Sequence, residues 1–109
     1  MVKKPHHGNK WMPVMYANYY GILKDIAEEH GYALAVHGTL DRDLDLIAVP
    51  WTEDASSPSV LIEAFCKSLG SQSVSTFEQK PHGRAAYSII TGGGGYIDIS
   101  VMPKIINTP

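Results

Sequence analysis

The sequence predicts a single α+β domain in which a small mixed β-sheet is covered on one face by two helices. Two observations predict this class. Segments with apolar residues at helical spacing and short apolar segments follow one another in the order helix, two strands, helix, three strands. The chain has 109 residues, of which 44% are hydrophobic and 18% are charged, which is typical of one small globular domain.

The first element is expected to be a helix over residues 13–30. Apolar residues recur there at spacings of three and four, as on one face of an α-helix. Pro13 suits the first helical turn, and Gly31 suits the position after the last turn. Residues 1–12 are polar without periodicity and are expected to form a flexible N-terminal arm.

Five segments that are apolar, β-branched or alternating predict strands. They cover residues 33–36, 44–49, 73–79, 83–91 and 96–102. The first two are separated by only a few residues, so we expect a tight turn between them. The last three are separated by turn-forming residues, which favours a meander.

The second helix is expected over residues 58–69. Ser57 suits its N-cap, Pro58 its first helical position, and Gly70 its end. The single domain is then expected to span residues 13–104, followed by a C-terminal tail over 105–109.

Composition limits the classes of partner. The net charge is −2, and no cluster of basic residues occurs beyond Lys3 and Lys4, which disfavours binding to duplex nucleic acid. No apolar run approaches the roughly 20 residues that span a bilayer, and no signal-peptide core is present, so a soluble cytoplasmic protein with no membrane contact is expected. Because a core this small gives a narrow stability margin, a homodimer is an option.

Two acids interrupt the apolar strand over 44–49. Residues i and i+2 of a strand share a face, so Asp43 and Asp45 are expected on one face while Leu44 and Leu46 point into the core. Like charges at this separation repel unless a cation, a basic partner or a retained proton offsets them. Hard carboxylate oxygens suit Mg²⁺ or Mn²⁺, which predicts a divalent metal site.

The last predicted strand carries one further acid, Asp98, between Ile97 and Ile99. If this strand lies beside the strand that bears Asp43 and Asp45, three carboxylates converge on one face of the sheet. The alternative is that this face is simply solvated, as in many antiparallel sheets.

These residues carry a resemblance that covers about residues 13–102. A glycine turn, an Asp-x-Asp strand and a later strand with one acid resemble the nucleotidyltransferase fold of the polymerase-β type. The resemblance implies a turn that holds nucleotide phosphates and three acids that are catalytic and bind Mg²⁺ or Mn²⁺. The matching positions are Gly38 and Thr39 for the turn, Asp43 and Asp45 for the metal pair, and Asp98 for the third acid. The run from His37 to Trp51 is also similar to small uncharacterised proteins of phages and prophages.

Further side chains are candidates for contacting the phosphates of a nucleotide. They are His37, Arg42, Lys80, His82 and Arg84. Each also has a plain structural explanation: a histidine satisfied by backbone at a strand end, a local ion pair, and a solvated hairpin tip. Their roles stay open at this point.

Three functions follow from these patterns. The first is a nucleotide-binding protein with a nucleotidyltransferase-like, Mg²⁺- or Mn²⁺-dependent carboxylate site, for which nucleotidyl transfer is an option. The second is a non-catalytic phage protein that sequesters a small signalling nucleotide. The third is a protein-interaction module that acts on a host or toxin partner. Whether the protein is an enzyme stays open, because only four residues lie between Gly38 and Asp43, fewer than the family usually has.

Overall fold

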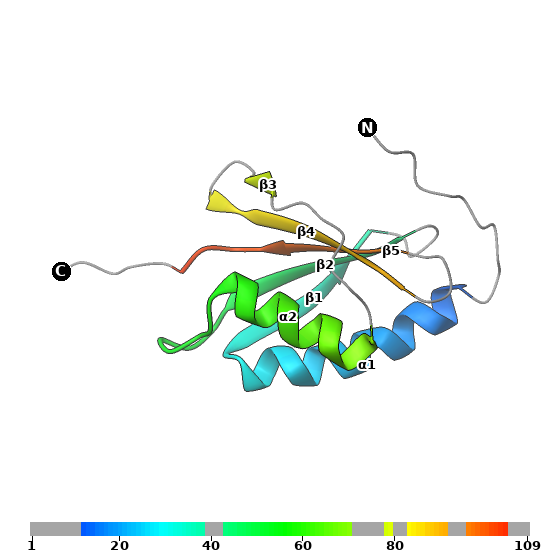
Figure 1. The fold of residues 1–109 in the computed structure, drawn as a ribbon, viewed down its shortest axis with the longest axis horizontal. Helices are drawn as coiled ribbons and strands as arrows, with labels where there is room; N and C mark the ends of the chain where they lie inside the picture. Colours follow the sequence, from blue (N-terminus) through cyan, green and yellow to red (C-terminus); the bar gives the residue numbers. More distant parts are fainter. Residues whose placement is uncertain (1–11, 39–42, 71–77, 80–82, 92–95, 105–109) are drawn as a thin grey trace.

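The computed structural model describes residues 12–38, 43–70, 78–79, 83–91 and 96–104, which form two helices and five strands (Figure 1). In chain order these are α1 (Met12–Glu29), β1 (Tyr32–His37), β2 (Asp43–Pro50), α2 (Pro58–Leu69), β3 (Glu78–Gln79), β4 (Ala85–Ile90) and β5 (Tyr96–Val101). Both predicted helices are confirmed, with their bounds shifted by at most one residue. Both strands of the first predicted pair are confirmed and are slightly longer than predicted.

The five strands form one mixed sheet in the order β1-β2-β5-β4-β3. The pair β1–β2 is antiparallel, β2–β5 is parallel, and β5–β4 and β4–β3 are antiparallel. The last three strands therefore form the predicted meander. The strand predicted over 73–79 is present as the two residues of β3, and residues 71–77 lie outside the described part of the chain.

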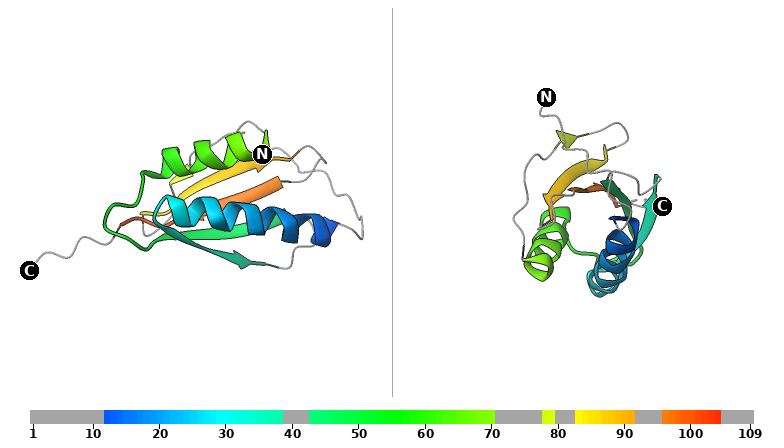
Figure 2. Two further views of the ribbon diagram at one scale, coloured as in Figure 1. Left: turned by 90° about the horizontal axis from the view of Figure 1, so that it is seen from below. Right: turned by 90° about the vertical axis from the view of Figure 1, so that its right-hand side faces the viewer.

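Both helices lie on one face of the sheet, as Figure 2 shows from two further directions. This confirms the predicted two-layer α+β class. Alternate residues of the strands face the helices and are buried, because successive side chains of a strand point to opposite faces. Leu44 and Leu46 of β2 are fully buried, as is Ile97 of β5. The fully buried Phe65 of α2 and Leu23 of α1 belong to the same core cluster.

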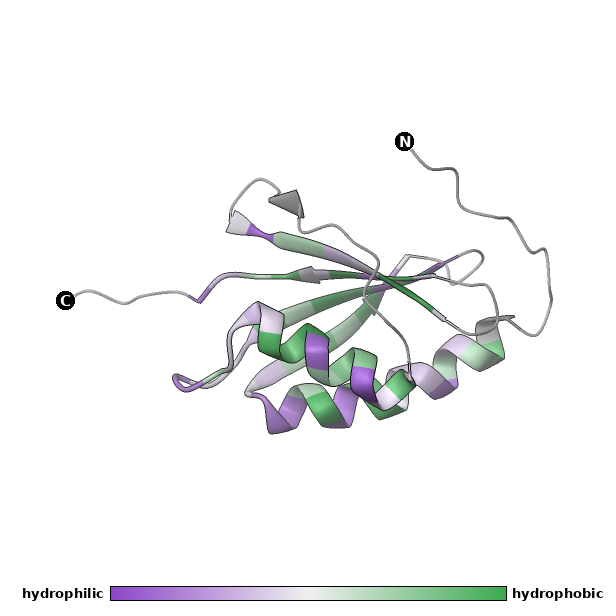
Figure 3. Ribbon diagram, viewed as in Figure 1, coloured by the Kyte–Doolittle hydropathy of each residue, from purple (hydrophilic) through white to green (hydrophobic). Residues whose placement is uncertain are grey.

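The helix ends follow the sequence. Ser57 precedes α2 with an extended backbone, φ −65° and ψ 155°, and proline begins the helix. Gly70 ends it in the left-handed conformation, with φ 66° and ψ 26°. Apolar and hydrophilic residues alternate along both helices (Figure 3), as expected when one side packs on a sheet and the other meets water.

Cys66 of α2 is buried and not in a disulfide. Among the described residues, no helix has both the length and the apolar character needed to cross a bilayer.

Candidate carboxylate site

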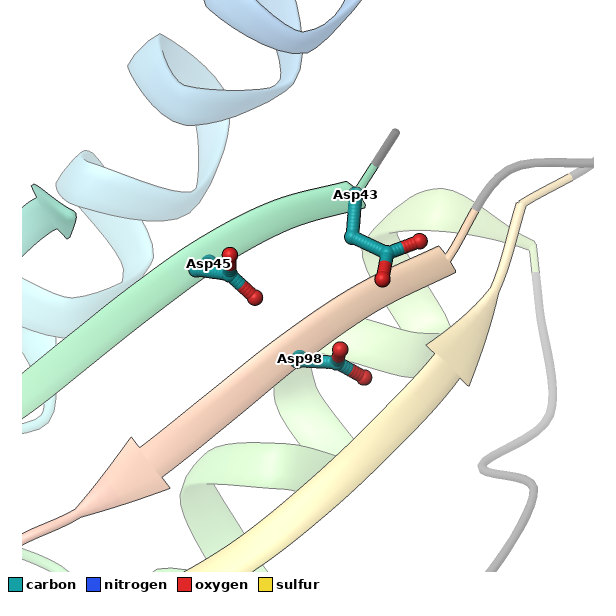
Figure 4. Close-up of side chains that lie close together, drawn as sticks. All are labelled: Asp43, Asp45 and Asp98. Carbon is teal, nitrogen blue, oxygen red and sulfur yellow. The ribbon is translucent and has the colours of Figure 1, made fainter. Parts of the chain in front are cut away.

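Three aspartates from two neighbouring strands meet on the sheet face opposite the helices. The parallel register of β2 and β5 places Asp45 directly beside Asp98, and Asp43 beside Tyr96. Each of the three acids offers a carboxylate oxygen, and these oxygens all lie within 4.8 Å of one another. Figure 4 shows the three side chains on the same side of the two strands. The predicted convergence of Asp43, Asp45 and Asp98 is therefore confirmed as geometry.

The same alternation that builds the core places these acids. Leu44 and Leu46 flank Asp45 and are fully buried on the helix side, while Asp45 itself is half-buried on the other side. Ile97 and Ile99, at most 1% exposed, flank the half-buried Asp98 in the same way. The acids are thus held by strands whose other face is anchored in the core.

The oxygen positions fit a divalent cation. Oxygen ligands about 2.1 Å from Mg²⁺ lie roughly 3 to 4 Å from one another in an octahedron. Carboxylate oxygens that already lie within 4.8 Å of one another need only a small inward movement to reach this spacing. The three acids are also hard oxygen donors, and their mutual repulsion is relieved when a dication binds. Among the described residues, no other group of three or more Asp, Glu, His or Cys side chains has ligand atoms this close together.

The predicted glycine turn begins next to this cluster. Gly38 follows β1 with φ +86°, a conformation that side-chain-bearing residues rarely adopt. A Cβ atom added to Gly38 would lie 2.7 Å from Oδ2 of Asp45, so the backbone at Gly38 lies close to this carboxylate. His37 is the register partner of Asp45 on β1 and is exposed.

The remaining candidates are distributed differently. Thr39, Arg42, Lys80 and His82 lie outside the described residues, so their proposed contacts stay predictions. Arg84 is half-buried and directly precedes β4, whose first residue pairs with Val101 at the end of β5. It therefore lies toward the opposite end of the strands from Asp98, and its role also stays a prediction.

Two residues near the acids were missed by the sequence interpretation. The hydroxyl of Ser88 on β4 donates a hydrogen bond to Oδ1 of Asp98 over 2.6 Å. The predicted antiparallel meander implied that some residue of β4 lies opposite Asp98. The sequence could not identify this residue, because the register of the two strands was unknown.

The other missed residue is Tyr16, which is fully buried on α1. Burial raises the pKa of the Tyr16 phenol, and the negative charge of Asp43 raises it further, whereas a hydrogen bond from the backbone of Tyr96 lowers it. The tyrosine therefore packs beneath the acidic end of β2 and β5. The sequence patterns had not singled out Tyr16.

No model of a known protein family and no curated protein matches the sequence. Solved structures do match the fold. A cytoplasmic RNA terminal U-transferase superposes with a TM-score of 0.61 at 12% identity over 85% of this chain and 30% of that one. The RNA terminal uridylyl transferase Cid1 superposes with a TM-score of 0.59 at 14% identity, over 85% of this chain and 32% of that one. A MgGTP-bound structure of the Cid1 poly(U) polymerase superposes with a TM-score of 0.57 at 14% identity, over 85% of this chain and 33% of that one.

The chain spans about a third of the length of these enzymes. At such low identity the likeness concerns the fold alone. The two helices, the mixed sheet and the structural neighbours together show that the chain has a nucleotidyltransferase-like α+β fold.

Proposed function

We propose that this protein binds a nucleotide through Mg²⁺ or Mn²⁺ held by Asp43, Asp45 and Asp98, and that nucleotidyl transfer is the reaction of this site. The observation that carries the proposal is the convergence of three carboxylates from two parallel strands, in a fold shared with nucleotidyltransferases. The structurally similar Cid1 poly(U) polymerase has a MgGTP-bound structure, which supports the choice of a nucleotide with a divalent metal.

Each part of the site would have a separate task. The three acids supply the negative charge and the hard oxygen atoms that retain the metal. Gly38 leaves space beside Asp45, and the turn that it begins, with Thr39, would face the phosphates. A bound divalent metal would neutralise phosphate oxygens and make an acceptor hydroxyl more acidic. His37, Arg42 and the cations of the 80–84 segment are the further candidates for phosphate contact.

The test is calorimetric titration with a panel of nucleoside triphosphates and signalling nucleotides, with and without Mg²⁺ or Mn²⁺. The wild type is compared with the variant Asp43→Asn/Asp45→Asn. The control is Asp25→Asn/Asp54→Asn, which removes the same charge from two exposed positions outside the cluster.

We expect metal-dependent nucleotide binding that is lost in the site variant and retained in the charge control. Binding of one signalling nucleotide without metal would instead favour the sequestering function. An absence of binding to every nucleotide would overturn the proposal and favour a protein-interaction module. If triphosphates bind with metal, release of pyrophosphate in the presence of hydroxyl acceptors, RNA among them, tests transfer itself.

A further inference from the structure

Asp98 is flanked by two different environments, because β5 lies between β2 and β4. On the β2 side are Asp45, its direct register partner, and Asp43. On the β4 side its register partner is Ser88. Directly opposed residues of antiparallel strands share a face, with Cβ atoms about 4.5 to 5.5 Å apart. Ser88 therefore stands on the open face in the same row as the acids.

The Ser88 hydroxyl makes a short bond to Asp98. Its Oγ lies 2.6 Å from Oδ1 of Asp98, and both residues are half-buried. Hydrogen bonds between a hydroxyl and a carboxylate anion have oxygen separations of about 2.5 to 2.7 Å and are roughly twice as strong as neutral ones. The bond thus restrains the rotation of the Asp98 carboxylate, which the negative charges of Asp43 and Asp45 repel.

We infer that Ser88 is a positioning residue, whose hydroxyl holds the Asp98 carboxylate in the orientation that completes the three-acid metal site. This inference rests on the proposed function, because it assigns Ser88 a part in metal binding. Groups that hydrogen-bond to metal ligands orient them, and their removal typically lowers metal affinity by about 10- to 100-fold. Ser88 adds no charge and contributes through direction alone.

The chain offers a matched control on the same face. Ser100 is a half-buried serine of β5, two residues after Asp98. Its register partners are Ile47 and Ala86, neither of which is an acid. A substitution at Ser100 changes the same kind of side chain without changing a partner of the cluster.

The experiment measures Mn²⁺ binding by electron paramagnetic resonance, which reports both affinity and the symmetry of the bound ion. Ser88→Ala is compared with Ser100→Ala and the wild type. A second pair, Ser88→Val and Ser88→Thr, has the same shape and differs only in the hydroxyl, so it separates hydrogen bonding from packing. Thermal unfolding without metal establishes that each variant is folded.

We expect Ser88→Ala and Ser88→Val to raise the Kd for Mn²⁺ about tenfold and to change the spectrum of the bound ion. Ser88→Thr should retain the wild-type affinity, as should Ser100→Ala. Wild-type affinity and spectrum in Ser88→Val would overturn the role of Ser88 and leave the proposed function standing. Failure of the wild type itself to bind Mn²⁺ would overturn the proposed function, and the inference with it.

Discussion

Replacing Gly38 with alanine is expected to weaken metal binding through Asp45. The new Cβ would lie 2.7 Å from Oδ2 of Asp45, a separation at which one of the two groups must move. The carboxylate is the mobile group, because it ends a side chain while the Cβ is fixed to the backbone. Displacing one of three ligands should raise the Kd for Mn²⁺ at least tenfold, which corresponds to about 1.4 kcal/mol.

The same substitution also strains the backbone. Gly38 has φ +86°, and residues with a Cβ lose about 1 to 2 kcal/mol in left-handed conformations. Gly70→Ala is the matched control, since Gly70 has φ +66° and no neighbouring atom lies within 4 Å of the added Cβ. We expect both variants to lose about 1 to 2 kcal/mol of unfolding free energy in urea without metal, whereas only Gly38→Ala should lose Mn²⁺ affinity.

Wild-type Mn²⁺ affinity in Gly38→Ala would refute this role of Gly38. In that case the contact with Asp45 does not shape the site, and Gly38 serves the turn alone. Equal losses of affinity in both variants would also count against it, because a general loss of stability would then explain the effect.

Two further predictions concern stability. Asp43→Asn/Asp45→Asn should raise the unfolding free energy without metal by about 1 kcal/mol, because repulsion within the cluster falls, and a less stable variant would contradict this. Added Mn²⁺ should raise the Tm of the wild type and leave the Tm of this variant unchanged. Burial, followed by the charge of Tyr87, raises the pKa of Tyr32 above its ordinary 10.0, so the folded state keeps this proton longer than the unfolded chain does. Stability from Tyr32 is therefore complete below pH 10 and is lost as the pH rises through the raised pKa. Tyr32→Phe should lose about 1 kcal/mol of unfolding free energy at neutral pH, because the hydrogen bond to the Ser56 carbonyl is removed. Above pH 10 its stability, measured by circular dichroism, should decline less steeply than that of the wild type.

Patterns within single segments predicted most of the fold. The alternation of Asp43, Leu44 and Asp45 indicated which side chains enter the core, and burial confirms it. Proline after Ser57 and glycine at position 70 marked the ends of α2 to the residue. Such signals depend on neighbours in the sequence, so they can be recognised without the tertiary structure.

Contacts set by strand register could not be predicted in the same way. The pairing of Ser88 with Asp98 depends on how β4 is aligned on β5, and a shift by two residues would place Ala86 or Ile90 there instead. The approach of Gly38 to Asp45 likewise requires the path of the backbone after β1. The pair Asp43 and Asp45 could therefore be recognised in the sequence, whereas the contacts that Ser88 and Gly38 make with the acids could not.

The parallel pairing of β2 and β5 couples the candidate site to the core. Parallel neighbours begin at the same end of a sheet, so acids near the start of both strands meet, and Asp45 lies beside Asp98 while Leu46 lies beside Ile99. A slip of one residue in β2 would turn its acids toward the helices and its leucines toward water, because side chains alternate with a period of two. The burial of Leu46 and Ile99, both at most 1% exposed, therefore opposes the same slip that would dismantle the acidic cluster. A core that fixes the register of these two strands also fixes the spacing of the carboxylates on their opposite face.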